Sequence, residues 1–375
     1  MKQPQESNPV APSTGAIDYS SVGVNVDREE NALSGLHRWL DKTLHFRDGL
    51  TGSPAMGIGF FANILNLGNG MGLAISTDGV GTKILVARMM NKYDTVGIDC
   101  IAMNVNDIIC VGAEPIALVD YLGIQEANAE LVEQISKGLH DGAKTARISI
   151  PGGELAQIPE MLTDELPGVA FDLVGTAIGS VHLDRVINGR GIADHDLIIG
   201  LRSSGIHSNG LTLARRALFE MGGFGVDTFR DELGRTVGEE LLEPTVIYVP
   251  PIMEMLNSEI EVKALAHITG DGLMNLTRVE SQVGFVIDNL PEPQPIFSLI
   301  QRCGTIQDEE MFRVFNMGIG FCIVVPERDA DRVLNIAGKH GNQGYVIGHT
   351  VAGSEKTVSL TQNGLIGKGR KFFKG

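Results

Sequence analysis

Glycine-rich polar loops that follow β-like runs and precede helix-like runs recur along this chain, and they limit the folds that it can adopt. STDGVGTK (76–83) is one such loop, and RSSGIHSNG (202–210) is another. The 47 glycines among 375 residues show no Gly-X-Y period, which excludes collagen and favours loops defined by their backbone. Since β-like and helix-like runs alternate, we predict an α+β protein.

Hydrophobic periodicity predicts the individual elements. We expect strands at 71–76, 116–122, 147–154, 171–181, 197–201, 320–326, 344–351 and 357–361. We expect helices at 82–90, 95–115, 129–146, 211–220 and 329–340. The polar stretch 182–196 predicts a boundary. We therefore expect a disordered tail at 1–16, an N-terminal domain at 17–184 and a C-terminal α/β domain at 185–375.

Composition excludes several classes of function. The formal net charge of −16 argues against binding to nucleic acid or to an anionic membrane. No apolar run reaches the length of a transmembrane helix, and the 4 cysteines lack metal-site spacing. We expect a cytoplasmic protein with reduced thiols, in which any anionic ligand meets locally positive groups.

The loop STDGVGTK combines features of an anion site. Its backbone N–H groups precede a helix, and Lys83 adds a positive charge at the helix start. Asp78 suits Mg²⁺, which bridges carboxylate and phosphate oxygens. The spacing fits neither a Walker A motif nor a dinucleotide fingerprint. A simple turn with Thr82 as an N-cap and a solvated lysine remains an equal alternative.

Two further acidic residues extend this hypothesis. Asp107 projects about 180° from the apolar stripe that begins at Ile98, and Glu154 follows two glycines at the expected end of a strand. Each has an ordinary interpretation, a solvated helix face and an exposed turn. Together with Asp78 they suit a divalent-metal site that also takes phosphate oxygens.

The second half carries polar loops of its own. Ser203, Ser204, Ser208 and Asn209 offer hydrogen bonds that suit a sugar or a phosphate. His207 suits general acid–base chemistry, and His267 in HITGDG precedes glycines in a similar way. A serine hydrolase is a poor match because no Gly-x-Ser-x-Gly elbow occurs.

The order of these motifs resembles one family. GVNVD (23–27), STDGVGTK, VNDI (105–108), GAEP (112–115), PGGE (151–154), SSGIHSNG (203–210), HITGDG (267–272) and FNMGIGF (315–321) follow one another as in phosphoribosylformylglycinamidine cyclo-ligases. The resemblance covers nearly all of the chain from Tyr19 onward. It implies a two-domain homodimer with a β-barrel across the dimer interface. It also implies ATP-dependent cyclisation of formylglycinamidine ribonucleotide to aminoimidazole ribonucleotide, with ADP and phosphate released, in de novo purine biosynthesis.

The resemblance also assigns roles to residues. It implies ATP contacts from Asp27, Asp78, Gly79, Gly81, Thr82, Asp107, Ser208 and Asn209. It implies Mg²⁺ ligands at Asp78, Asp107 and Glu154, and catalytic roles for Lys83, His207 and His267. The chain departs from the usual pattern at Leu155, Gln157, Glu160 and Asp271. These departures concern the metal count and the contacts to the substrate.

Two other functions remain as alternatives. One is another oxygen-activating enzyme of the same superfamily, of the selenophosphate synthetase or hydrogenase-maturation type. The first type carries a reactive Cys near its N-terminus and the second ends in a cysteine, whereas the first cysteine here is Cys100 and the chain ends in KFFKG. The other alternative is a nucleotide-binding regulator without turnover, for which fewer acidic residues would suffice.

Overall fold

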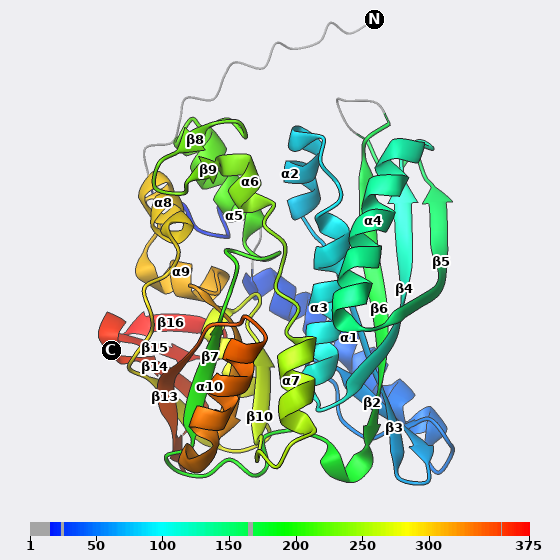
Figure 1. Cartoon of the computed structure of the whole chain (residues 1–375), viewed down its shortest axis with the longest axis vertical. Helices are drawn as coiled ribbons and strands as arrows, with labels where there is room; N and C mark the ends of the chain where they lie inside the picture. Colours follow the sequence, from blue (N-terminus) through cyan, green and yellow to red (C-terminus); the bar gives the residue numbers. More distant parts are fainter. Residues whose placement is uncertain (1–15, 24–25, 164–167, 354) are drawn as a thin grey trace, which may run out of the picture.

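Two β-sheets, one in each half of the chain, form the framework of the computed structural model (Figure 1). The structure describes residues 16–23, 26–163, 168–353 and 355–375. The disordered tail predicted at 1–16 therefore lies almost wholly outside the described residues. No described helix is long and apolar enough to cross a bilayer.

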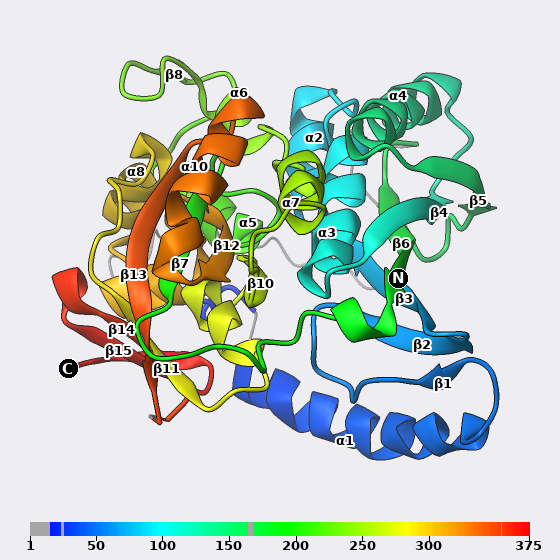
Figure 2. The same cartoon turned by 60° about the horizontal axis from the view of Figure 1, so that its bottom comes forward.

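The N-terminal half contains a six-stranded sheet in the order β1-β2-β3-β6-β4-β5. Its strands are β1 (Ser53–Pro54), β2 (Asn63–Gly68), β3 (Met71–Gly79), β4 (Glu114–Ile124), β5 (Ser149–Gln157) and β6 (Phe171–His182). Its helices are α1 (Val26–Leu44), α2 (Lys83–Met90), α3 (Val96–Cys110) and α4 (Ala129–Ala146). Figure 2 shows α1 running along the outer side of β1.

Alternation along the strands leaves this sheet covered on one face only. In β6 every second residue, from Phe171 to Val181, is buried. On the other face Val119 and Tyr121 of β4 are 44% and 38% exposed. Met71, Leu73, Ile75, Val119, Tyr121, Val174 and Ile178 share this second face by register, and we call it the open face. A sheet with one open apolar face has a surface available for association.

The C-terminal half contains an eight-stranded sheet in the order β10-β12-β7-β13-β11-β14-β15-β16. Its strands are β7 (Leu197–Arg202), β10 (Ala264–His267), β11 (Val283–Ile287), β12 (Ile319–Val325), β13 (Gly344–Ala352), β14 (Thr357–Leu360), β15 (Leu365–Lys368) and β16 (Lys371–Lys374). β8 (Phe229–Arg230) and β9 (Arg235–Thr236) form a separate hairpin. Its helices are α5 (Leu211–Arg215), α6 (Val237–Leu241), α7 (Val249–Leu256), α8 (Pro295–Gly304), α9 (Asp308–Val314) and α10 (Ala330–Lys339).

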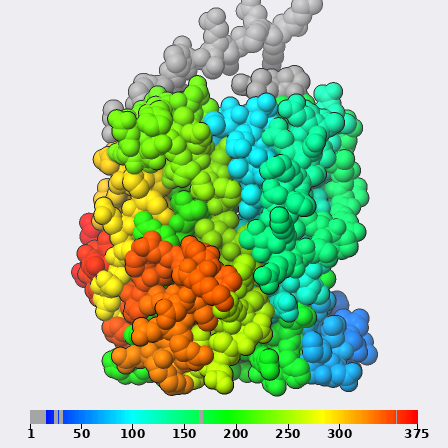
Figure 3. Space-filling model, viewed as in Figure 1, coloured from blue at the N-terminus to red at the C-terminus, as the bar shows by residue number. Residues whose placement is uncertain are grey.

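Helix α3 connects the two halves. It packs on β3 and β6 of its own sheet and on β10 and α7 of the other half. Its residues are buried almost throughout, including the polar Asp99, Asn104 and Asn106. Figure 3 shows the two halves in contact along the length of the molecule. The buried apolar residues of both halves form one continuous cluster, and α3 lies between the two sheets.

Several expected boundaries differ from the structure, and two of them concern candidate site residues. The helix expected at 95–115, with Gly112 and Pro115 as its predicted stops, ends at Cys110, because Gly112 has a φ of 78° and does not continue it. The strand expected to end at 154 continues through Gly152 and Gly153 to Gln157, since both glycines pair with β4. Glu154 therefore lies within a strand and not on a tight turn.

Candidate active site

Asp78, Asp107 and His267 come together where α3 meets the C-terminal half. Asp78 is the penultimate residue of β3, Asp107 lies in the last turn of α3, and His267 ends β10. His267 Nδ1 is 2.9 Å from Asp107 Oδ1. Two of the three expected carboxylates and one of the two expected histidines thus share one site, although they lie up to 189 residues apart in the sequence.

Electrostatics at this cluster favours a cation. Burial, together with the neighbouring Asp107 carboxylate, raises the pKa of Asp78 to about 6, although the Gly79 N–H, His267 and Arg278 oppose the rise. Two carboxylates at close range resist ionising together unless a positive charge joins them. Asn104 Oδ1 lies near Asp78, is buried, and has no hydrogen-bond partner among the described residues. These oxygens fit a hard divalent cation.

Hydrogen bonds specify the tautomer of His267. Asn106 Nδ2 lies 3.5 Å from His267 Nε2 and donates to the Val246 carbonyl at 2.8 Å. Because an amide nitrogen only donates, Nε2 accepts and Nδ1 carries the proton that His267 donates to Asp107. His267 is fully buried. It therefore orients the Asp107 carboxylate and does not itself face solvent.

The glycine-rich turn has the expected backbone conformation, but the Lys83 ammonium does not add its charge to this turn. Gly81 has a φ of 71°, a conformation that favours glycine, and α2 begins two residues later. Lys83 Nζ is fully buried and donates to Asp99 at 2.9 Å and to the Glu243 carbonyl at 2.6 Å. The prediction that its ammonium faces a phosphate is wrong, because Asp99 and Glu243 already take up its charge. Thr82 shares a hydrogen bond with Thr212 at 3.0 Å and makes no N-cap bond.

Glu154 lies outside the cluster. Asp78 pairs with Gly175, Gly175 with Asp120, and Asp120 with Gly153, so these residues share the helix-covered face of the sheet. Glu154 is the next residue along and therefore projects on the open face. Among the described residues, no three His, Cys, Asp or Glu side chains form a metal-binding group. The prediction of one shared site for Asp78, Asp107 and Glu154 within a single chain is wrong.

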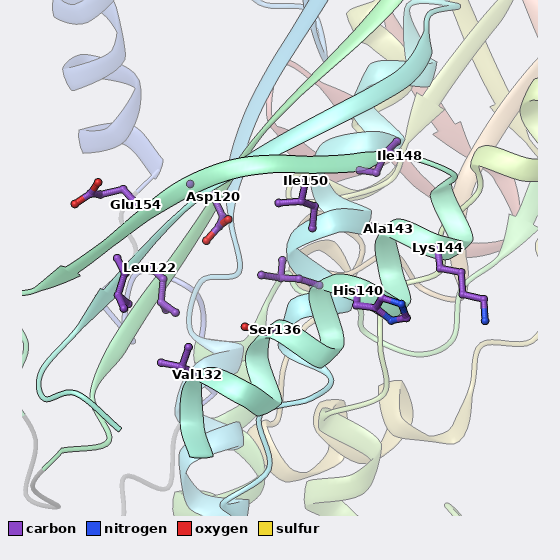
Figure 4. A pocket seen from close by; sticks show the side chains of 13 residues that line it. Asp120, Leu122, Val132, Ser136, His140, Ala143, Lys144, Ile148, Ile150 and Glu154 are labelled. Carbon is purple, nitrogen blue, oxygen red and sulfur yellow. The ribbon is translucent and has the colours of Figure 1, made fainter. Parts of the chain in front are cut away.

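A large hollow lies near Glu154, between α4 and strands β4 and β5 (Figure 4). Its volume is about 670 Å³, and its walls include Leu122, Val132 and Ile150. Asp120 points into it and Glu154 points away (Figure 4). Burial raises the pKa of Asp120. Neither Asp78 nor Asp107 is among the residues that line this hollow.

The loop SSGIHSNG lies beside HITGDG, and several of its polar side chains are already hydrogen-bonded within the protein. Ser203 Oγ donates to Asn316 at 3.0 Å, and Ser204 Oγ donates to the Pro244 carbonyl at 2.6 Å. His207 Nε2 accepts from the Ser204 N–H at 3.2 Å. Burial, with the charges of His267 and Lys83, lowers the pKa of His207 well below its usual value. His207 is thus a neutral residue that shapes the loop.

Ser208 and Asn209 keep their side chains at the surface of this loop. Both are half-buried, and Ser208 Oγ is 3.1 Å from Thr245 Oγ1. Asn209 lies beside Gly270 of HITGDG, since a Cβ on Gly270 would be 3.5 Å from Asn209 Oδ1. Gly79 ends β3 next to Asp78. Asp27 lies in the first turn of α1, but its side chain falls outside the described residues.

Sequence reasoning missed the segment 243–248, which joins the halves. Thr245 donates twice to Asp99, the Glu243 and Val246 carbonyls accept from Lys83 and Asn106, and the Tyr248 N–H donates to Asn106 at 2.9 Å. The segment LEPTVIY has neither helical nor strand periodicity, so no pattern pointed to it. We call residues 243–248 the strap.

Comparisons with known proteins match each half of the chain to a family model. Residues 61–181 match the family model "AIR synthase related protein, N-terminal domain", and residues 193–361 match the C-terminal domain of the same name. The chain thus has the two-domain fold of the AIR synthase related proteins.

Relatives that match over nearly their whole length identify the enzyme family more closely. A phosphoribosylformylglycinamidine cyclo-ligase of Methanocaldococcus jannaschii is 47% identical over 355 residues, covering 94% of this chain and 96% of the relative. One from Pyrococcus horikoshii is 46% identical over 340 residues, covering 91% and 97%. The chain belongs to the phosphoribosylformylglycinamidine cyclo-ligase family, a family of ligases in purine biosynthesis. The two alternative functions are not favoured.

Solved structures show the same fold at low identity. The structure titled "AaThiL complexed with AMPPCP and TMP" matches with a TM-score of 0.60 and 16% identity, covering 90% of this chain and 96% of that one. "T. maritima PurL complexed with FGAR" matches with a TM-score of 0.55 and 16% identity, covering 83% of this chain and 47% of that one.

Proposed function

We propose that this protein converts phosphoribosylformylglycinamidine to aminoimidazole ribonucleotide with ATP as the phosphoryl donor. The formyl oxygen attacks the γ-phosphorus and ADP leaves. The amidine nitrogen then attacks the activated carbon, the imidazole closes, and phosphate leaves. The proposal rests on one observation in a chain that belongs to this family. The carboxylates of Asp78 and Asp107 are neighbours at the junction of the two halves.

The carboxylates Asp78 and Asp107 are the proposed ligands of Mg²⁺, with Asn104 Oδ1 beside them. Bound Mg²⁺ would neutralise charge on the phosphates, which is the main requirement of phosphoryl transfer. His267 is a positioning residue that holds Asp107 through its Nδ1–H. The turn at Gly81 supplies backbone N–H groups for the phosphates. Lys83 and His207 contribute through the framework and not through contact with the reacting atoms.

We also propose that two copies associate through the open face. Val119 and Tyr121 expose apolar surface that one chain leaves uncovered. Two such faces would bury each other and give the barrel that the family resemblance implies. Glu154 lies on this face, so we include it in the dimer contact region and not among the Mg²⁺ ligands of one chain.

The direct test is turnover. Purified protein is incubated with phosphoribosylformylglycinamidine, ATP and MgCl₂, and the aromatic amine of the product is measured by diazotisation alongside ADP. We expect product and ADP in equal amounts. ADP without aromatic amine, or no ADP at all, would overturn the proposed function. Replacing MgCl₂ by a chelator should abolish both products.

A further inference from the structure

A buried ion pair provides a fixed hydrogen-bond acceptor at the junction of the halves. Lys83 Nζ lies 2.9 Å from each oxygen of the Asp99 carboxylate, and both side chains are fully buried. An ionised carboxylate can only accept hydrogen bonds. Any hydroxyl that contacts Asp99 must therefore donate to it.

Thr245 of the strap makes that contact. Its backbone N–H donates to Asp99 Oδ1 at 2.8 Å and its hydroxyl donates to the same oxygen at 2.7 Å. A hydroxyl carries a single proton, and here Asp99 takes it. Thr245 Oγ1 can therefore only accept from its other neighbour, Ser208 Oγ, at 3.1 Å.

The direction of this chain determines what Ser208 offers to a ligand. Its only proton points to the buried Thr245, so its outward side presents lone pairs. A hydroxyl oriented in this way repels phosphate oxygens, and it accepts hydrogen bonds from N–H groups. The polarisation that begins at the Lys83–Asp99 pair strengthens the acceptor. The expectation that Ser208 donates to a phosphate is thereby reversed.

We infer that Thr245 fixes the orientation of the Ser208 hydroxyl, and that Ser208 accepts a hydrogen bond from an amide or amidine N–H of the substrate. This inference rests on the proposed function, because it names the substrate group that forms a hydrogen bond with the same site. Thr245 is a positioning residue, and Ser208 is the residue that contacts the substrate. The phosphates of ATP carry no N–H donor, so we expect their binding not to depend on Thr245.

Steady-state kinetics of Thr245→Val, Ser208→Ala and the double variant test the inference. Thr245→Val keeps the shape of the side chain and removes the hydroxyl. We expect each single variant to raise the KM for phosphoribosylformylglycinamidine about 10-fold, with kcat and the KM for ATP unchanged, since one hydrogen bond is lost. The double variant should also show about 10-fold and not about 100-fold, because both changes remove the same interaction. Thr245→Ser should retain the wild-type KM.

Controls separate this role from a structural one. Thr350 in β13 is also buried and donates its hydroxyl to the Ala193 carbonyl at 2.6 Å. Thr350→Val should lower the melting temperature as Thr245→Val does and leave the KM unchanged. Ser208→Ala leaves the buried pair intact, so it tests the contact even if Thr245→Val folds poorly. Multiplying effects in the double variant, a raised KM for ATP, or a normal substrate KM in both single variants would overturn the inference. Wild-type protein without cyclisation would instead overturn the proposed function.

Discussion

Asp78 shows how a functional site costs stability. Its pKa rises from 3.8 in the unfolded chain to about 6 in the folded protein, chiefly through burial. Below 3.8 the group is protonated in both states and contributes nothing. Above 6 it is ionised in both states, and the folded state carries the whole penalty of a buried charge, which is on the order of 3 kcal/mol. The proposed Mg²⁺ would offset this penalty by pairing with the carboxylate.

We predict that Asp78→Asn stabilises the metal-free protein at pH 8 and lowers turnover on the order of 100-fold, the usual effect of losing one strong electrostatic contact. The gain in the free energy of unfolding should shrink as the pH falls through 6 and disappear near 3.8. Urea titrations at several pH values measure the first effect and the aromatic-amine assay the second. A variant that is less stable than wild type at pH 8 would contradict the electrostatic account.

Lys83 has the opposite character, since its charge supports the fold. Lys83→Met would leave the Asp99 carboxylate buried without its counter-ion. We expect a loss of about 3 to 5 kcal/mol in the free energy of unfolding, measured by urea denaturation. Lys137→Met is the matched control, because Lys137 is 61% exposed beside Asp141 and solvent screens such a pair. Equal effects of the two substitutions would show that burial of the Lys83 pair is unimportant.

Helices α3 and α4 pack more closely than most helix pairs because glycines face each other. A Cβ on Gly138 would lie 2.2 Å from the Asp94 carbonyl oxygen, and one on Gly97 would lie 2.3 Å from the Leu139 nitrogen. Backbone atoms cannot yield as a flexible side chain does. The close crossing keeps α3 flat against its sheet, and this in turn places Asp107 beside Asp78.

Gly138→Ala should therefore separate the two helices and destabilise the protein by about 3 kcal/mol. Turnover should fall as well, since Asp107 moves with α3. Gly35→Ala in α1 is the control, because no atom lies within 4 Å of a Cβ built there. Thermal melts and turnover assays on both variants provide the measurement. Wild-type stability in Gly138→Ala would mean that the helices can adjust their spacing freely.

The sequence predicted elements well where one periodicity persisted. The helix expected at 129–146 has those bounds in the structure, and the strand expected at 171–181 extends by one residue. Helix α1 was missed, and no pattern identified the β15–β16 hairpin. The site was predicted in part: Asp78, Asp107 and His267 meet, but Lys83 and Glu154 lie elsewhere. Charge and spacing indicate what a side chain is able to do, whereas burial and strand register decide where it points, and both depend on distant segments.

At the scale of the whole molecule, the open face is an apolar surface that the described residues of one chain leave uncovered. Tyr121→Asp places a charge at its centre, and we predict that it converts a wild-type dimer to monomers, because a desolvated carboxylate without a partner opposes association. Light scattering after size exclusion measures the mass. Phe229→Asp, at a residue that is 59% exposed on the β8–β9 hairpin, should leave the mass unchanged. A monomeric wild type would remove the proposed dimer.

The strap has a consequence for how enzymes of this kind can exchange parts. Residues 243–248 belong to the C-terminal half of the chain, yet five of their hydrogen bonds reach Lys83, Asp99 and Asn106 in the other half. A chimaera of two relatives joined within 182–196 would separate these partners into different parents. A crossover placed just after Tyr248 would keep them together. Recombination among such genes should therefore tolerate a junction just after Tyr248 better than one within 182–196. This holds although the polar stretch 182–196 has the composition of a domain boundary.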